Sequence, residues 1–265
     1  MDNVLLAFSL TLLAGLSTGI GSALAFFSRR TNKLLLSLSM GFSAGVMIYV
    51  SFVEILSEAG EALSGAYGES TGSWIAAASF FGGVLIIAGI DRLVPSYENP
   101  HEPRPIEEMR EPVDDARLSR IGVLAAMAIA IHNFPEGIAS FTAVLADPAI
   151  GVTIAVAIAI HNIPEGIAVS VPIYFATGNR KKAFWWSFLS GLAEPLGALL
   201  AFLFLRPFFT ETVFGVLLGS VAGIMVFISL DELFPAAREY GKGHAAIYGL
   251  IAGMAVMALS LLLLR

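Results

Sequence analysis

The chemistry that this chain could perform is concentrated in one polar motif that occurs twice. Residues 128–139 read AIAIHNFPEGIA and residues 157–168 read AIAIHNIPEGIA, so eleven of the twelve paired positions are identical. On an α-helix the histidine and asparagine precede the glutamate by four and three residues, so the three side chains share one side. Imidazole and carboxylate groups suit Zn²⁺ and other first-row divalent ions. The motif therefore predicts a metal site with the ligands His132, Asn133, Glu136, His161, Asn162 and Glu165.

Each copy of the motif also contains a proline where a helix needs an N–H group. Pro135 and Pro164 cannot bond to the carbonyl oxygens of the residues four positions earlier, Ile131 and Ile160. We expect each helix to kink there, and freed carbonyls are tolerated at membrane depth where they line a polar cavity. Four ionisable side chains in apolar surroundings would cost about 3 kcal/mol each on insertion scales. A purely structural role for them is therefore disfavoured.

Other apolar stretches carry further acidic residues. Glu194 stands beside the helix-bending Pro195 and is predicted to be another metal ligand. Three acids near the ends of their stretches have two interpretations, namely interfacial carboxylates or groups on the path of the cation into and out of the site. These are Glu54, Asp231 and Glu232. The chain has no cysteine, which excludes disulfides, thiolate zinc sites and iron–sulfur clusters.

The composition places these residues in a membrane protein. The chain is 57% hydrophobic and 14% charged, whereas a soluble domain is about 45–50% apolar and about 25% charged. Spans of about 17–25 apolar residues are long enough to cross a bilayer as helices, and open strands would leave backbone groups unsatisfied in lipid. The predicted fold class is all-α, a polytopic bundle with eight transmembrane helices at 4–27, 34–56, 73–94, 121–144, 149–175, 184–204, 212–234 and 244–264.

The positions of the basic residues predict the orientation of this bundle. The loops after the first, third, fifth and seventh stretches contain 13 of the 15 Lys and Arg residues, and such loops face the cytoplasm. Both termini are therefore expected outside. The two motif copies then lie on antiparallel neighbours, helices 4 and 5, with the inverted-repeat character that places transporter sites near the bilayer midplane.

The predicted domain organisation is a single membrane transport domain over residues 1–265. Residues 95–120 are rich in proline and charge and are expected to form a disordered cytoplasmic loop between helices 3 and 4. The outer loop 57–73 contains three acids and no basic residue, which favours weak attraction of cations. The formal net charge of −6 gives no basis for nucleic-acid binding.

The doubled His-Asn-x-Pro-Glu-Gly motif on two of eight spans resembles the ZIP family of divalent-metal transporters, in particular its ZupT-like bacterial branch. The resemblance extends over essentially the whole chain, with supporting matches at 49–54, 191–195 and 228–233. It implies uptake of Zn²⁺, and also of Fe²⁺, Mn²⁺, Co²⁺ or Cd²⁺, across the cell (inner) membrane into the cytoplasm. The metal would be the transported substrate, and no prosthetic group is expected.

The resemblance also implies a binuclear site. One position would use His132, Glu136, His161 and Glu165. The other, richer in oxygen, would use Asn133, Glu136, Asn162, Glu165 and Glu194, so that two glutamates bridge both ions. The long loop is often rich in histidine in this family, whereas here it contains His101 alone, which weakens the case for metal capture by the loop.

Two other functions remain as alternatives at this stage. A metal-selective channel or metal-gated receptor could use the same ligands, since ligand spacing does not distinguish it from a carrier. An intramembrane metalloenzyme is disfavoured because each copy has a helix-breaking proline that catalysis does not need, so we expect no enzymatic activity. The expected partners are divalent metal ions and the lipid bilayer, with a homodimer left open.

Overall fold

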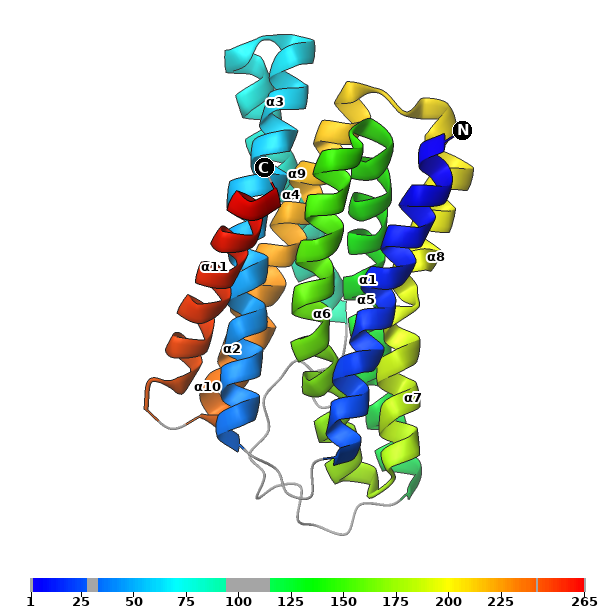
Figure 1. Ribbon diagram of the computed structural model, residues 1–265, viewed down its shortest axis with the longest axis vertical. Coiled ribbons are helices and arrows are strands. Elements are labelled where there is room, and N and C mark those ends of the chain that lie inside the picture. Colours follow the sequence, from blue (N-terminus) through cyan, green and yellow to red (C-terminus); the bar gives the residue numbers. More distant parts are fainter. Residues whose placement is uncertain (1, 28–32, 94–114, 242, 265) are drawn as a thin grey trace.

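The computed structural model of the chain is a bundle of long helices (Figure 1). It describes residues 2–27, 33–93, 115–241 and 243–264, and these residues contain no strand. The predicted all-α class is therefore confirmed for the described part of the chain. Both chain ends lie toward the same end of the bundle, the upper one in Figure 1.

Several of the long helices are continuous rods in which the helix type changes. The α-helices are α1 (Asp2–Phe27), α2 (Lys33–Val50), α3 (Leu56–Tyr67), α4 (Glu69–Leu93), α5 (Asp115–Ala146), α6 (Pro148–Thr177), α7 (Arg180–Gly191), α8 (Ala193–Leu200), α9 (Glu211–Ile228), α10 (Phe234–Tyr240) and α11 (Ala245–Leu264). Three π-helical segments, η1 (Ser51–Ile55), η3 (Ala201–Leu205) and η5 (Ser229–Leu233), and a 3₁₀ turn, η4 (Arg206–Phe208), join or extend them.

Within the described residues, seven segments are long and apolar enough to cross a membrane. They contain α1, α2 with α3, α4, α6, α7 with α8, α9 with α10, and α11, in whole or in part. Seven of the eight predicted spans thus have a counterpart. The remaining one, 121–144, lies within the 32-residue helix α5, which packs beside α6 and α8.

Two predicted loops differ from the structure. The prediction of an outer loop over residues 57–73 was wrong, because α3 continues the rod of α2 as far as Tyr67 and α4 begins at Glu69. The turn between them is at Gly68, whose φ of 83° suits glycine, which has no Cβ. The amphipathic segment α3 is helical because it buries Ala59 and Leu63 against α4 and α9. Helix α5 begins at Asp115, inside the predicted loop 95–120, and residues 94–114 lie outside the described part.

The helices form two groups, which are side by side in Figure 1. The polar bundle consists of α1, α5, α6, α7 and α8, and the companion bundle consists of α2, α3, α4, α9, α10 and α11. Helix α1 packs on α6, and α5 on α6 and α8, whereas α2 packs on α11, and α4 on α9. The two groups meet where α2 lies on α6 and where α5 lies on α9.

Glycines bring helix backbones together inside each group. A Cβ at Gly166 of α6 would lie 2.1 Å from the carbonyl oxygen of Thr18, and one at Gly45 of α2 would lie 2.0 Å from that of Leu250. Among the described glycines, every such close approach joins helices of one group, and none joins the two groups. Close backbone contact therefore ties each bundle together internally but does not lock one bundle to the other.

A second duplicated pattern lies in the companion bundle. Residues 41–54 and 219–232 share Gly, Ala, Gly, Met, Ser and Glu at the same spacing. In both copies the serine starts a π-helical segment, at Ser51 in η1 and at Ser229 in η5. The two helices run in opposite directions (Figure 1), so the inverted-repeat character extends beyond helices α5 and α6.

Candidate metal centre

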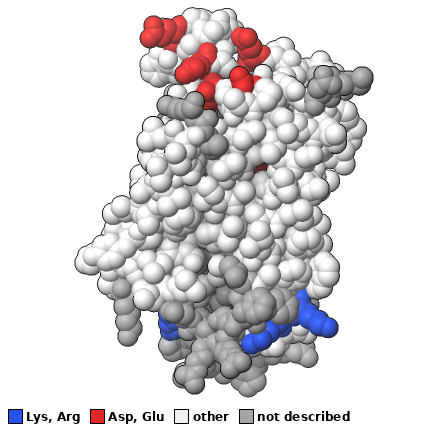
Figure 2. Space-filling view, in the orientation of Figure 1, with Lys and Arg blue, Asp and Glu red and all other residues white. Residues whose placement is uncertain are grey.

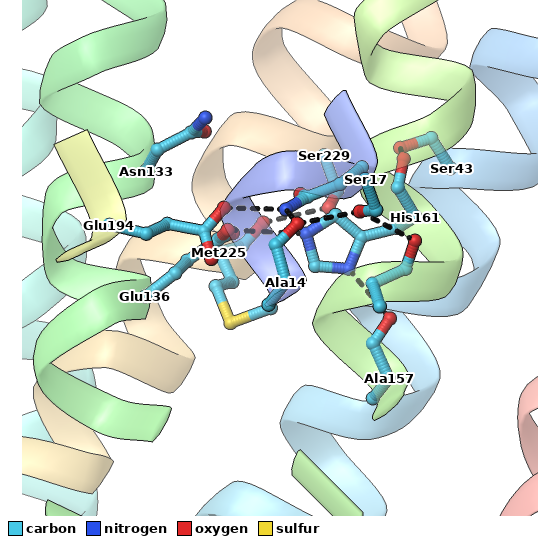
Figure 3. A network of polar contacts seen from close by, with 12 residues as sticks. Ala14, Ser17, Ser43, Asn133, Glu136, Ala157, His161, Glu194, Met225 and Ser229 are labelled. Carbon is cyan, nitrogen blue, oxygen red and sulfur yellow. Dashed lines mark hydrogen bonds and ion pairs between the residues drawn. The ribbon is translucent and has the colours of Figure 1, made fainter. Parts of the chain in front are cut away.

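The two copies of the polar motif meet in the middle of the polar bundle. Helices α5 and α6 pack against each other, and His161 Nε2 lies 3.2 Å from Glu136 Oε2 (Figure 3). Both side chains are buried, with exposed fractions of 0% and 1%. The predicted convergence of an imidazole from one copy with a carboxylate from the other is therefore present in the structure.

The hydrogen bond of His161 Nδ1 determines whether Nε2 can donate or accept when the ring is neutral. His161 Nδ1 lies 3.1 Å from the carbonyl oxygen of Ala157, one turn earlier in α6. A carbonyl can only accept, so Nδ1 carries a proton and donates it. In the neutral ring Nε2 is then an acceptor that faces a carboxylate oxygen. Two acceptors at this separation need a proton or a cation between them.

A second polar pair lies between α6 and α8. Asn162 Nδ2 donates to Glu194 Oε1 and, at 2.9 Å, to the carbonyl oxygen of Ala14 in α1. Asn162 and Glu194 are both 0% exposed. Their other oxygens, Asn162 Oδ1 and Glu194 Oε2, accept no hydrogen bond from any described residue. Buried oxygens of this kind are costly unless something binds them.

The remaining described ligand candidates lie in the same core. Asn133 donates from Nδ2 to the carbonyl oxygen of Ser190 in α7 at 3.3 Å, as Asn162 does to α1. Glu165 is buried, and Glu136 and Glu165 both interact electrostatically with Glu194. Gly137 permits this proximity, because a Cβ there would lie 2.0 Å from the carbonyl oxygen of Glu194.

Both α5 and α6 remain α-helical through their prolines. On α6, hydroxyl groups from neighbouring helices supply donors around the proline. Ser17 of α1 donates to the carbonyl oxygen of Ala159 at 3.0 Å, and Ser43 of α2 donates to that of His161 at 3.4 Å. The backbone beside the ligands is thus held from both sides, once from each bundle.

Not every predicted ligand is brought into contact. The side chain of His132 lies outside the described part of the structure. Among the side chains that are described, no three His, Asp or Glu groups converge closely enough to hold a metal ion together. The acids instead have polar partners within the core: Glu136 Oε2 faces His161 Nε2, and Glu194 accepts a hydrogen bond from Asn162.

The three acids outside the motifs belong to the companion bundle. Glu54 is buried in η1, eleven residues beyond Ser43 on the same rod, which is about 16 Å along a helix axis. Asp231 is exposed and Glu232 is half-buried, both in η5. Helix α1 was not predicted to reach the site, yet its Ala14 carbonyl and Ser17 hydroxyl contact the motif on α6. The sequence of α1 gives only a weak indication of this contact, because a serine on an apolar helix is not part of any metal-binding motif.

Charge is divided between the two ends of the molecule (Figure 2). Acidic side chains gather at the upper end, where α3 and α4 meet, and basic side chains appear at the lower end. The sides between them are almost uncharged in this view. The loops of membrane proteins that face the cytoplasm are typically rich in Lys and Arg.

Comparison with known proteins gives one consistent family. The ZIP zinc transporter family profile matches residues 91–261. The zinc transporter ZupT of Nitratidesulfovibrio vulgaris is 64% identical, over 98% of each chain. Those of Chlorobium luteolum and Oceanobacillus iheyensis are 63% and 60% identical, and the match covers 100% of each chain in both cases.

Proposed function

This chain belongs to the ZIP family of zinc transporters, and we propose that it binds its cation within the polar bundle, between α5, α6 and α8. It is a multi-pass protein of the bacterial inner membrane that takes up divalent metal ions, zinc first. The metal is its substrate, and the family is one of transporters rather than enzymes.

The observation that carries the proposed site is the short distance of 3.2 Å between His161 Nε2 and Glu136 Oε2, which come from the two copies of the motif. The ring of His161 is oriented by its hydrogen bond to the Ala157 carbonyl, so that Nε2 points at Glu136 Oε2. Metal-binding histidines commonly use one nitrogen in this way to aim the other. A divalent cation beside these two atoms would take the place of the proton that they share and gain two ligands that Zn²⁺ favours.

The proposed site has two positions. The nitrogen-containing position uses His132, Glu136, His161 and Glu165. The oxygen-rich position uses Asn133, Glu136, Asn162, Glu165 and Glu194. The buried oxygens Asn162 Oδ1 and Glu194 Oε2, which lack donors among the described residues, support the second position. Imidazole suits Zn²⁺, while carboxylate and carbonyl oxygens suit harder ions such as Mn²⁺.

The proposed topology has eight membrane-spanning helices with both termini outside. Seven spans meet the criteria of length and hydropathy, and α5 is the eighth because it lies antiparallel beside α6 within the bundle (Figure 1). The acidic end then faces outward and the basic end faces the cytoplasm (Figure 2). Glu54 would lie on the outer part of the path and Asp231 and Glu232 on the inner part.

Transport requires the site to open to each side in turn, and we place this movement between the two bundles. Glycine contacts tie the helices within each bundle but not across the boundary. The cation ligands all lie in the polar bundle, whereas α2 and α9 of the companion bundle cover them. Movement of the polar bundle along α2 and α9 would carry the site between the two membrane faces without breaking its ligand set.

Zinc uptake into proteoliposomes tests the site. Glu136→Gln keeps the size of the side chain and removes its charge, and we expect it to abolish saturable uptake. Glu61→Gln, on the exposed face of α3, is the matched control and should transport like the parent protein. Undiminished uptake by the Glu136 variant would refute the proposed site, and flux that never saturates would favour a channel.

A further inference from the structure

Helix α1 reaches the proposed metal site although it has no ionisable side chain beyond its first residue, Asp2. The carbonyl oxygen of Ala14 accepts a hydrogen bond from Asn162 Nδ2 at 2.9 Å. The same carbonyl accepts one from the hydroxyl of Ser17 at 2.6 Å, and that hydroxyl also lies 3.0 Å from the carbonyl oxygen of Ala159 (Figure 3). One backbone oxygen therefore connects the serine of α1 to the asparagine of the motif.

This connection determines which way the amide of Asn162 faces. Its two neighbours, the Ala14 carbonyl and Glu194 Oε1, are both acceptors. Only the NH₂ end of the amide can satisfy them, and it has two hydrogens for that purpose. The oxygen, Oδ1, is left on the remaining side, buried and without a donor among the described residues. An oxygen held in this way is ready for a cation and need not reorient to bind it.

The close approach of α1 to α7 makes the contact possible. A Cβ at Gly15 would lie 2.4 Å from the carbonyl oxygen of Gly191, so the two backbones touch one turn before Glu194. Ser17 then fixes α1 against α6, since its hydroxyl is shared between the carbonyls of Ala14 and Ala159. This hydroxyl is the α1 side chain that bonds both to the Ala14 carbonyl and to the motif helix α6.

We propose that Ser17 is a positioning residue for cation selectivity, acting through the Ala14 carbonyl to aim Asn162 Oδ1 at the oxygen-rich position. This inference rests on the proposed function. Loss of the hydroxyl would let α1 rotate and the amide of Asn162 turn, which weakens an oxygen ligand but leaves the imidazole ligand in place. The affinity for ions that prefer oxygen ligands should fall more than the affinity for Zn²⁺, which can use the nitrogen-containing position.

The test compares Ser17→Ala with Ser22→Ala. Ser22 is also a buried α1 serine, and it bonds to Ser187 of α7 at 2.5 Å, further along the helix from Asn162. Binding of Mn²⁺ and of Zn²⁺ to the purified detergent-solubilised protein is measured by calorimetry, and KM for each ion in proteoliposomes. Ser17→Ala should weaken Mn²⁺ binding about fivefold, the factor expected for one ordinary hydrogen bond. It should change Zn²⁺ binding less than about twofold, and Ser22→Ala should change neither.

Three results would overturn the proposal: equal losses for both ions in Ser17→Ala, no loss for either, or the same Mn²⁺-selective loss in Ser22→Ala. Failure of the parent protein to bind Zn²⁺ would instead overturn the proposed function, and this inference with it. If Ser17→Ala does not fold, Ser17→Cys carries the same comparison, because a thiol nearly keeps the volume but donates weakly.

Discussion

The two bundles of this protein use similar helices for different tasks. Both are held together by glycines that let backbones touch, as Gly166 does against α1 and Gly45 against α11. Most of the buried polar side chains, however, belong to the polar bundle, where they form hydrogen bonds from helix to helix. The companion bundle buries mainly aliphatic and aromatic groups.

In this protein, different residues therefore determine how closely the helices pack and how the ligand side chains are oriented. Glycine contacts set how closely helices approach, in both bundles, without choosing a function. The asparagine and serine hydrogen bonds to neighbouring carbonyls, present around Asn133, Asn162 and Ser17, give the polar bundle fixed side-chain directions. We therefore propose that the polar bundle binds the cation and that the companion bundle provides a supporting surface.

The largest expected effect is the loss of an acid from the polar bundle. Glu165→Ala or Glu194→Ala should lower Zn²⁺ affinity by about a hundredfold or more, because a charged ligand in a low-dielectric site is lost. Calorimetry on the purified protein measures the Zn²⁺ affinity of each variant. A variant at either position that binds Zn²⁺ as tightly as the parent would show that the ligands lie elsewhere.

A covalent link between the bundles should nearly stop transport. Ile131 of α5 packs against an apolar cluster that includes Ile224 and Ile228 of α9, and the chain has no cysteine of its own. We expect uptake by Ile131→Cys/Ile228→Cys to fall at least about tenfold when the thiols are bridged and to recover on reduction. Such a bridge would hold the polar bundle in one position.

The control for that experiment is a link inside the polar bundle. Ser22 and Ser187 are hydrogen-bonded, so Ser22→Cys/Ser187→Cys should bridge readily without stopping uptake. Equal inhibition by both bridges would contradict movement of the polar bundle as a unit, and full activity of the bridged α5–α9 pair would contradict the movement itself.

Alanine substitutions of two glycines should differ in their effect on the stability of the protein. Gly166→Ala would force its Cβ against the Thr18 carbonyl, and such overpacking costs about 1–3 kcal/mol. Gly82→Ala, on α4, meets nothing within 4 Å and should be neutral or stabilising by about 0.5–1 kcal/mol, since glycine disfavours helix. Thermal unfolding in detergent separates the two, and equal midpoints would mean that the close approach is not needed.

The smallest effect is expected in the companion bundle. Glu54 is buried in η1, outside the ligand set, so Glu54→Gln should raise KM for Zn²⁺ about threefold by removing a charge from the outer path. Asp231→Asn, at an exposed position in η5, should change KM less. Complete loss of uptake in Glu54→Gln would move part of the binding site into the companion bundle.

The sequence predicted the helical class, seven of the span positions and the contact between the two motif copies, because these depend on hydropathy and on residue spacing. It did not predict that α3 is helical, since Leu56–Tyr67 is amphipathic and its buried residues Ala59 and Leu63 find their packing partners on α4 and α9, which are distant in the sequence. It also did not predict the role of Ser17, because the hydrogen bond to Ala159 joins residues 142 positions apart. The division into two bundles likewise depends on tertiary contacts that hydropathy does not encode.

Anomalous scattering from crystals grown with Zn²⁺ would locate the bound cation relative to the two bundles. We expect a zinc peak inside the polar bundle, between α5 and α6, within bonding distance of Glu136 and His161, and a second position beside Asn162 and Glu194. A peak confined to the acidic outer end, or one bounded by side chains of the companion bundle alone, would show that the polar bundle does not hold the cation.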